Sequence, residues 1–205
     1  MPDRGLLSQR ALALQPSLTL AIAAKAKQLR AEGRDICSLS AGEPDFDTPA
    51  FIRNAASVAL EAGHTRYGPA AGEPALREAI AAKLSQENQV PTTAAQVLVT
   101  NGGKQALYNL FQMLLEPGDE VLLPSPYWTT YPESIALAGG TPVVVPTDES
   151  SGYRTSPAQL DQFVTERTRA LVFVSPSNPT GAVYSPAEVE AIGAWAADRG
   201  IWVIS

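Results

Sequence analysis

Five short runs of apolar, mostly β-branched residues constrain the fold of this chain more than any other feature. The runs are apolar throughout rather than alternating with polar residues, as expected for strands buried on both faces of a parallel sheet. From about Val97 onward they alternate with helix signals, which predicts an α/β fold with a mostly parallel sheet and helices on both faces. The runs are Val97–Thr100, Glu120–Leu123, Thr141–Val145, Ala170–Val174 and Ile201–Ile204.

Capping residues, prolines and glycines mark where the helices begin and end. A hydroxyl or carboxylate side chain caps a helix start, proline is tolerated in the first turn, and glycine is typical just after the end. The expected starts are Ser17, Thr48-Pro49, Pro74 and Ser185-Pro186-Ala187-Glu188, and the expected stops are Gly33, Gly63 and Gly200. Residues 1–45 do not fit the alternation, so we expect them to form an arm or a small-domain segment, with residues 46–205 forming the larger domain.

Composition excludes several classes of function. Hydrophobic residues make up 45% of the 205 residues and charged residues 18%, which is typical of a globular protein. The net charge of −6 gives no indication of a surface for nucleic acid or an anionic membrane. No apolar run approaches the roughly 20 residues of a membrane helix. These features argue against a nucleic-acid-binding or membrane protein, and with a single cysteine we expect a reducing, cytoplasmic compartment.

The chain has one cysteine, Cys37, and one histidine, His64. An intrachain disulfide is excluded, and one residue of each type cannot supply the usual ligands of a zinc site. We expect Cys37 to be an ordinary buried residue, His64 to lie in a loop, and no metal to be bound.

Three loops that follow predicted strands carry the candidate site, because ligands of open α/β sheets gather beyond the carboxyl ends of the strands. Gly102-Gly103-Lys104 opens a helix and could hold an anion, although the same glycines are equally typical of a tight turn. Trp128 follows the next strand and could stack on a flat ring or simply pack in the core. Asn178 lies in a proline-rich turn and could hydrogen-bond a ring substituent. Together these residues suit a phosphorylated heteroaromatic cofactor.

The motifs in these and two earlier segments resemble the class I aminotransferases, and more narrowly the bacterial-type (subgroup I-beta) aspartate aminotransferases. The match runs in order over essentially the whole chain. The matching segments are Ala41-Gly42-Glu43-Pro44-Asp45-Phe46-Asp47-Thr48-Pro49, Thr65-Arg66-Tyr67 with Gly72, Asn101-Gly102-Gly103-Lys104-Gln105-Ala106, Ser125-Pro126-Tyr127-Trp128 and Ser177-Asn178-Pro179-Thr180-Gly181.

This resemblance implies the large domain of a fold-type I transferase that depends on pyridoxal 5′-phosphate. The backbone amides of Gly102, Gly103 and Lys104 would hold the cofactor phosphate. Trp128 would stack on the pyridine ring, and Asn178 would hydrogen-bond the ring oxygen. The family also has cis peptide bonds before the prolines that match Pro126 and Pro179.

The resemblance further implies a homodimer that acts on amino acids and 2-oxo acids. Tyr67 would reach the cofactor phosphate of the partner subunit. Gly42 would offer its N–H group to the substrate carboxylate, where Trp128 and Asn178 would also contact the substrate. Lys104 would read the distal carboxylate of aspartate or glutamate, and Ser17 and Thr19 match positions near that pocket.

The sequence also departs from the family pattern. Family members continue the last strand into Asp-Glu-x-Tyr and later supply the lysine that binds the cofactor covalently and an arginine that binds the α-carboxylate. None of these follows in this chain, whose last strand ends at Ser205, so we expect an N-terminal fragment that is inactive on its own and contains no catalytic residue. Its lysines are Lys25, Lys27, Lys83 and Lys104.

Three alternatives remain open. Glutamate- or aspartate-dependent prephenate aminotransferases share the subgroup pattern. A cofactor-free, non-catalytic phosphate-binding α/β module would use only the Gly102-Gly103 turn. A transcription regulator with an aminotransferase-like domain would need a basic DNA-binding segment, and residues 1–40 show neither the charge nor a helix-turn-helix pattern.

Overall fold

The computed structural model describes residues 8–14, 18–39, 42 and 44–205. The chain divides into two compact units, one made of Met1–Gln15 with Gly102–Ser205 and the other of Pro16–Asn101. This division does not test the predicted boundary between residues 45 and 46, which stays a prediction.

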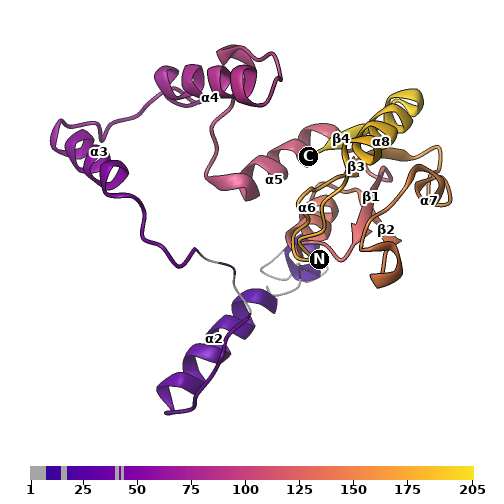
Figure 1. The fold of residues 1–205 in the computed structure, drawn as a ribbon, viewed down its shortest axis with the longest axis horizontal. Helices are drawn as coiled ribbons and strands as arrows, with labels where there is room; N and C mark the ends of the chain where they lie inside the picture. Colours follow the sequence, from indigo (N-terminus) through magenta and orange to yellow (C-terminus); the bar gives the residue numbers. More distant parts are fainter. Residues whose placement is uncertain (1–7, 15–17, 40–41, 43) are drawn as a thin grey trace, which may run out of the picture. The chain divides into compact units, whose positions relative to one another are not determined.

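A parallel sheet forms the centre of the first unit (Figure 1). Its strands are β1 (Glu120–Ser125), β2 (Thr141–Pro146), β3 (Thr168–Val172) and β4 (Trp202–Ile204), in the order β2-β1-β3-β4. All three pairings are parallel, with Leu122 opposite Val143 and Leu171, and Leu171 opposite Val203. Four of the five predicted strands are therefore confirmed, with shifts of up to two residues at their ends.

Helices cover this sheet on both faces, which explains why residues 121–123 of β1 and 170–172 of β3 are apolar and buried. The helices of this unit are α1 (Gln9–Ala13), α5 (Gly102–Leu114), α6 (Thr130–Leu137), α7 (Pro157–Leu160) and α8 (Pro186–Arg199), with a 3₁₀ turn at Glu149–Ser151. Val121 and Leu123 pack with Phe111 of α5 and Ile135 of α6, whereas Leu122 packs in a second cluster that contains Ile192, Trp195 and Ala196 of α8. Successive β1 side chains thus enter opposite cores.

The ends of α8 match the sequence prediction residue by residue. The Ser185 Oγ accepts a hydrogen bond from the Glu188 N–H at 3.4 Å, and the Glu188 carboxylate accepts one from the Ser185 N–H at 2.7 Å. Gly200 follows the helix with a φ of +64°, a left-handed conformation that glycine adopts without a steric penalty.

The second unit contains α2 (Leu18–Ala31), α3 (Ala50–Glu61), α4 (Pro74–Glu87) and a 3₁₀ turn at Ala94–Gln96. The predicted starts at Thr48-Pro49 and Pro74 and the predicted stops at Gly33 and Gly63 agree with these helices. The predicted cap Ser17 lies outside the described residues. His64 lies in a loop as predicted.

Two expectations for the second unit are wrong. Residues 97–100 form no strand in the described structure; Val99 N–H donates a single backbone hydrogen bond to Ala71 at 3.0 Å, and Arg77 binds the Val97 carbonyl oxygen at 2.9 Å. These hydrogen bonds occupy the Val99 N–H and the Val97 carbonyl oxygen, which would pair with a neighbouring strand if residues 97–100 belonged to a sheet. Cys37 is exposed rather than buried, because it lies in a segment without helix or strand structure that follows α2.

A buried carboxylate fixes the start of β1. Glu120 is 5% exposed, and its carboxylate accepts hydrogen bonds from Thr165 Oγ1 at 2.6 Å and Arg167 Nε at 3.0 Å. The hydrogen bond from Thr165, followed by that from Arg167, lowers the pKa of Glu120 below its ordinary value. Because Arg167 lies largely in solvent, its charge is partly screened.

We expect Glu120→Gln to reduce the free energy of unfolding by about 1–2 kcal/mol at neutral pH, since a hydrogen bond to a charged group is lost. A lowered folded-state pKa contributes stability above the unfolded pKa of about 4.3, and this contribution is lost as the pH falls through the folded value. Urea unfolding at several pH values should therefore show a difference from wild type that shrinks below about pH 4. Glu166→Gln, at an exposed neighbouring position, is the control, and an equal loss in both variants would contradict this account.

Within the residues that the structure describes, no helix is both long enough and apolar enough to span a membrane.

Candidate active site

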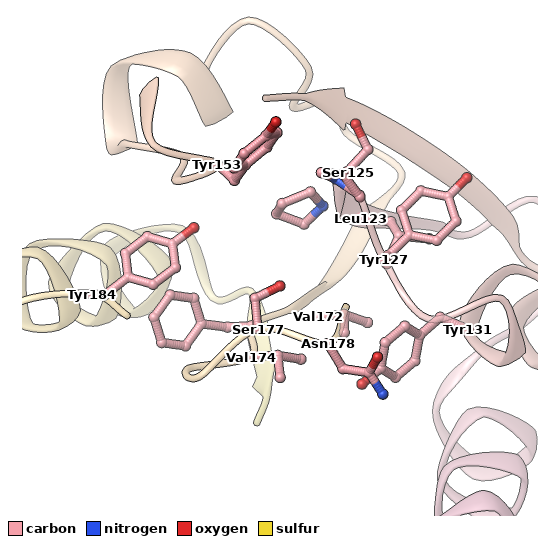
Figure 2. Close-up of a pocket in the computed structure, with 13 residues that line it drawn as sticks. Leu123, Ser125, Tyr127, Tyr131, Tyr153, Val172, Val174, Ser177, Asn178 and Tyr184 are labelled. Carbon is pink, nitrogen blue, oxygen red and sulfur yellow. The ribbon is translucent and has the colours of Figure 1, made fainter. Parts of the chain in front are cut away.

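A cavity in the first unit lies at the carboxyl ends of β1 and β3 (Figure 2). One wall comes from the end of β1 and the loop that follows it, and another from the end of β3 and its loop. The remaining lining comes from three tyrosines elsewhere in this unit, Tyr131, Tyr153 and Tyr184. The lining residues are Leu123, Pro124, Ser125, Pro126, Tyr127, Tyr131, Tyr153, Val172, Phe173, Val174, Ser177, Asn178 and Tyr184.

Asn178 reaches this cavity from a turn that closes on itself. The Ser177 N–H donates to the Ala182 carbonyl oxygen at 2.9 Å, and the Gly181 N–H donates to the Ser177 carbonyl oxygen at 2.8 Å. The Ser175 Oγ accepts a hydrogen bond from the Tyr184 N–H at 3.1 Å, which ties the turn to the start of the segment before α8. The turn therefore holds the Asn178 amide on a short, hydrogen-bonded frame.

The expected cis peptide bonds before Pro126 and Pro179 are confirmed, and a third precedes Pro176. All three lie in the two loops that line the cavity.

Trp128 lies beside the cavity and contacts residues from two helices. The Nζ atom of Lys104, in the first turn of α5, is 5.3 Å from the centre of the Trp128 ring. The ring of Tyr131, in the first turn of α6, meets the Trp128 ring edge-on, with centroids 5.6 Å apart and planes at 90°. Lys104 and Trp128, predicted from separate loops to serve one site, are thus in contact.

The start of α5 has open space beside its two glycines. A Cβ added at Gly102 or Gly103 would meet no atom within 4 Å. Gly102 has a φ of +73°, which favours glycine. The dipole of a 13-residue helix and its first N–H groups favour an anion at this end.

The remaining predicted site residues belong to the second unit. The Tyr67 side chain is fully exposed, and Gly42 is exposed with no atom within 4 Å of an added Cβ. Thr19 lies in α2, and Ser17 lies outside the described residues. The predicted contacts of these residues with cofactor, partner subunit or substrate stay predictions.

Sequence reasoning did not single out three tyrosines of the cavity. Tyr131 and Tyr184 are buried, and burial raises the pKa of both hydroxyl groups, although the hydrogen bond that Tyr184 accepts from the Thr155 N–H opposes the change. Tyr153 has a φ of +56°, which is unusual for a residue other than glycine. Tyr131 could have been identified from its position three residues after Trp128, because this spacing places both residues near the start of one helix.

The chemistry of this cavity is that of binding and orientation. Its described lining offers amide, hydroxyl and phenol groups but no carboxylate, histidine or lysine, and the nearby cation is Lys104. No group of metal-ligating side chains occurs among the described residues. These residues can therefore hold and orient a flat polar molecule.

Comparison with known proteins agrees with this fold. Residues 34–205 match the family described as aminotransferase class I and II, and the chain belongs to that family. The aspartate aminotransferase of Streptomyces avermitilis is 54% identical over the whole chain, which covers 50% of that protein. The aspartate/prephenate aminotransferase of Thermus thermophilus is 49% identical over 97% of the chain, which covers 52% of that relative.

A solved structure, the aspartate aminotransferase from Thermus thermophilus with maleate, superposes with a TM-score of 0.93 at 49% identity over 96% of this chain and 52% of that one. The chain thus spans about half the length of these relatives, although it covers 96% of the probable aspartate aminotransferase of Streptomyces griseus, at 53% identity. The predicted α/β fold of the aminotransferase large domain is confirmed.

Proposed function

We propose that the whole protein is a pyridoxal-phosphate-dependent aspartate aminotransferase, which moves the amino group of aspartate to 2-oxoglutarate. The observation that carries this proposal is the convergence of three loops in the first unit. Lys104 contacts Trp128, Trp128 contacts Tyr131, and Tyr131 lines the same cavity as Asn178. Family membership and the names of relatives that are about half identical support the same reaction.

The residues present fit pyridoxal phosphate. The open space beside Gly102 and Gly103, at a helix N-terminus, suits the phosphate. Trp128 would stack on the ring, and the Asn178 amide would donate a hydrogen bond to the ring oxygen. When bound, this cofactor supplies an electron sink for the bond that is broken at the substrate α-carbon.

The chain's own residues would bind and orient the substrate. The Lys104 ammonium would pair with the distal carboxylate of aspartate or 2-oxoglutarate, a charge-assisted contact that a monocarboxylic substrate lacks. Asn178 and Trp128 would contact the substrate from the cavity side. Gly42 would donate its N–H group to the α-carboxylate.

We extend the proposal to the assembly of the whole protein. A homodimer would let Tyr67 of each subunit reach the cofactor phosphate of the other, which suits a tyrosine side chain that is fully exposed in this chain. Size-exclusion chromatography with light scattering would test the assembly, and a monomer that retains full activity would contradict it.

Product analysis tests the proposed reaction. The whole protein with pyridoxal phosphate should convert aspartate and 2-oxoglutarate to oxaloacetate and glutamate. If the protein instead turns over prephenate with glutamate or aspartate as donor and leaves 2-oxoglutarate untouched, it is a prephenate aminotransferase, the alternative favoured by the name of the Thermus thermophilus relative. If the protein retains no absorbance near the visible edge after incubation with pyridoxal phosphate and removal of the free cofactor, the non-catalytic phosphate-binding module becomes the better account.

The 205-residue chain on its own should show no transamination above that of free pyridoxal phosphate. A lysine must attach the cofactor and move the substrate proton. Lys104 lies 5.3 Å from the centre of the Trp128 ring, but its proposed partners are the phosphate and the distal carboxylate. Coupled spectrophotometry of oxaloacetate formation measures this rate. Robust turnover by the isolated chain would refute the assigned role of Lys104.

A further inference from the structure

We infer that Tyr131 is a positioning residue of this site, and that its ring holds the indole of Trp128 in the orientation needed to stack on the cofactor. The inference rests on the proposed function, since it assigns a role within the same site. Neither the sequence motifs nor the family resemblance marked Tyr131.

The contact itself is specific in geometry. The two rings meet at 90° with centroids 5.6 Å apart, the edge-to-face arrangement that aromatic pairs prefer. The Tyr131 N–H also donates to the Trp128 carbonyl oxygen at 3.0 Å, so the backbone fixes the spacing of the two residues. Such a contact restricts rotation of the indole as well as its distance.

The two rings differ in how firmly the core holds them. Tyr131 is 8% exposed and packs in the cluster of α5, α6 and the sheet that includes Phe111 and Ile135. Trp128 is only partly buried and lies at the border of that cluster. A partly buried indole keeps rotamer freedom unless a fixed neighbour removes it, and Tyr131 is such a neighbour.

The other contact on the indole is less permanent. Lys104 has a long, flexible side chain, and its ammonium lies 5.3 Å from the Trp128 ring centre. If Lys104 binds the distal carboxylate of the substrate as proposed, its cation moves toward that carboxylate. The Tyr131 contact then remains to hold the indole while substrate is bound.

Tyr131 also links the stacking residue to the hydrogen-bonding residue. Its ring lines the same cavity as Asn178, and both are drawn in Figure 2. The aromatic ring of Tyr131, rather than its hydroxyl group, makes the contact with the Trp128 ring. Tyr131→Phe should therefore retain the function that Tyr131→Leu loses.

Fluorine NMR of the whole protein labelled with 5-fluorotryptophan tests the positioning directly and without cofactor. The Trp128 resonance is assigned by its absence in Trp128→Phe. We expect Tyr131→Leu to shift and broaden this resonance, while Tyr131→Phe and the control Phe111→Leu leave it unchanged. Phe111 is a fully buried ring of the same cluster, so Phe111→Leu causes a packing defect like that of Tyr131→Leu. An unchanged Trp128 resonance in Tyr131→Leu would overturn the inference.

Titration with pyridoxal phosphate gives the functional readout. We expect Tyr131→Leu to weaken binding about two- to tenfold, the worth of an edge-to-face pair, and to reduce the visible circular dichroism of the bound cofactor. Tyr131→Phe should bind within about twofold of wild type. Equal affinity losses in Tyr131→Leu and Phe111→Leu would contradict a positioning role.

The two readouts separate failure of this inference from failure of the proposed function. If the wild-type protein binds no pyridoxal phosphate, the proposed function fails, while the fluorine spectrum still decides whether Tyr131 holds Trp128. Should Tyr131→Leu not fold, Tyr131→Met fills a similar volume without a ring and gives the same comparison.

Discussion

Gly103→Val should weaken binding of pyridoxal phosphate by about 10- to 100-fold, the loss expected when hydrogen bonds to a charged group are removed. The added side chain would enter the open space beside the start of α5, where we propose that the phosphate lies. The melting temperature should stay the same or rise slightly, because a Cβ at this position meets no atom within 4 Å and valine is a better helix former than glycine. Absorbance titration and thermal unfolding measure the two effects.

Gly193→Val is the matched control for this prediction. Gly193 lies in α8, is exposed, and likewise has no atom within 4 Å of an added Cβ. We expect wild-type affinity for pyridoxal phosphate in this variant. Equal affinity in Gly103→Val and wild type would show that the phosphate does not lie at the start of α5.

Trp128→Ala should have the second large effect. Stacking of a flat heteroaromatic ring on an aromatic side chain is worth about 1–3 kcal/mol, so affinity for pyridoxal phosphate should fall about 5- to 150-fold. The variant also removes the ring beneath the Lys104 ammonium, so the KM for aspartate should rise as well. Absorbance titration and steady-state kinetics measure these changes.

The control for Trp128→Ala is Trp202→Ala, which removes an indole from β4 at the edge of the sheet where 59% of the side chain is exposed. It should leave affinity for the cofactor within about twofold of wild type, since no stacking contact is lost. If both variants lose affinity equally, the effect comes from the fold and not from a stacking contact.

Much of the fold could be predicted because local and tertiary preferences agree in the first unit. The four strands of the sheet are short apolar runs, and both faces of the sheet are covered by helices. The capping box at Ser185 and the glycine at position 200 mark α8 because capping depends on residues within one turn of the helix end. Interactions over such short separations are visible in a sequence.

Predictions in the second unit failed where long-range contacts decide the structure. Residues 97–100 have the composition of a strand, but pairing depends on which backbone groups face them, and here Ala71 and Arg77 use some of those groups. Cys37 has a typical core side chain, yet its exposure depends on what packs over the segment after α2. Composition alone does not specify these neighbours.

The candidate site shows the same division. The turns with Trp128 and Asn178 could be predicted because each combines an unusual residue with the end of a strand, β1 or β3. The turn with Gly102 follows no strand in the described structure, so only its paired glycines marked it. Tyr131, Tyr153 and Tyr184 could not, because they reach the cavity from elements whose positions depend on the packed sheet. Side chains that hold the site residues in place are of types that also occur throughout protein cores, so the sequence alone does not distinguish them.

A crystal structure of the whole protein with pyridoxal phosphate is the most direct measurement of whether separate loops of one unit hold a single flat, phosphorylated molecule. We expect the phosphate at the backbone amides that open α5, the ring against the Trp128 indole, and the Asn178 amide at the ring oxygen. A cofactor bound away from Trp128 and Asn178, or a phosphate bound anywhere other than the paired glycines, would contradict this expectation.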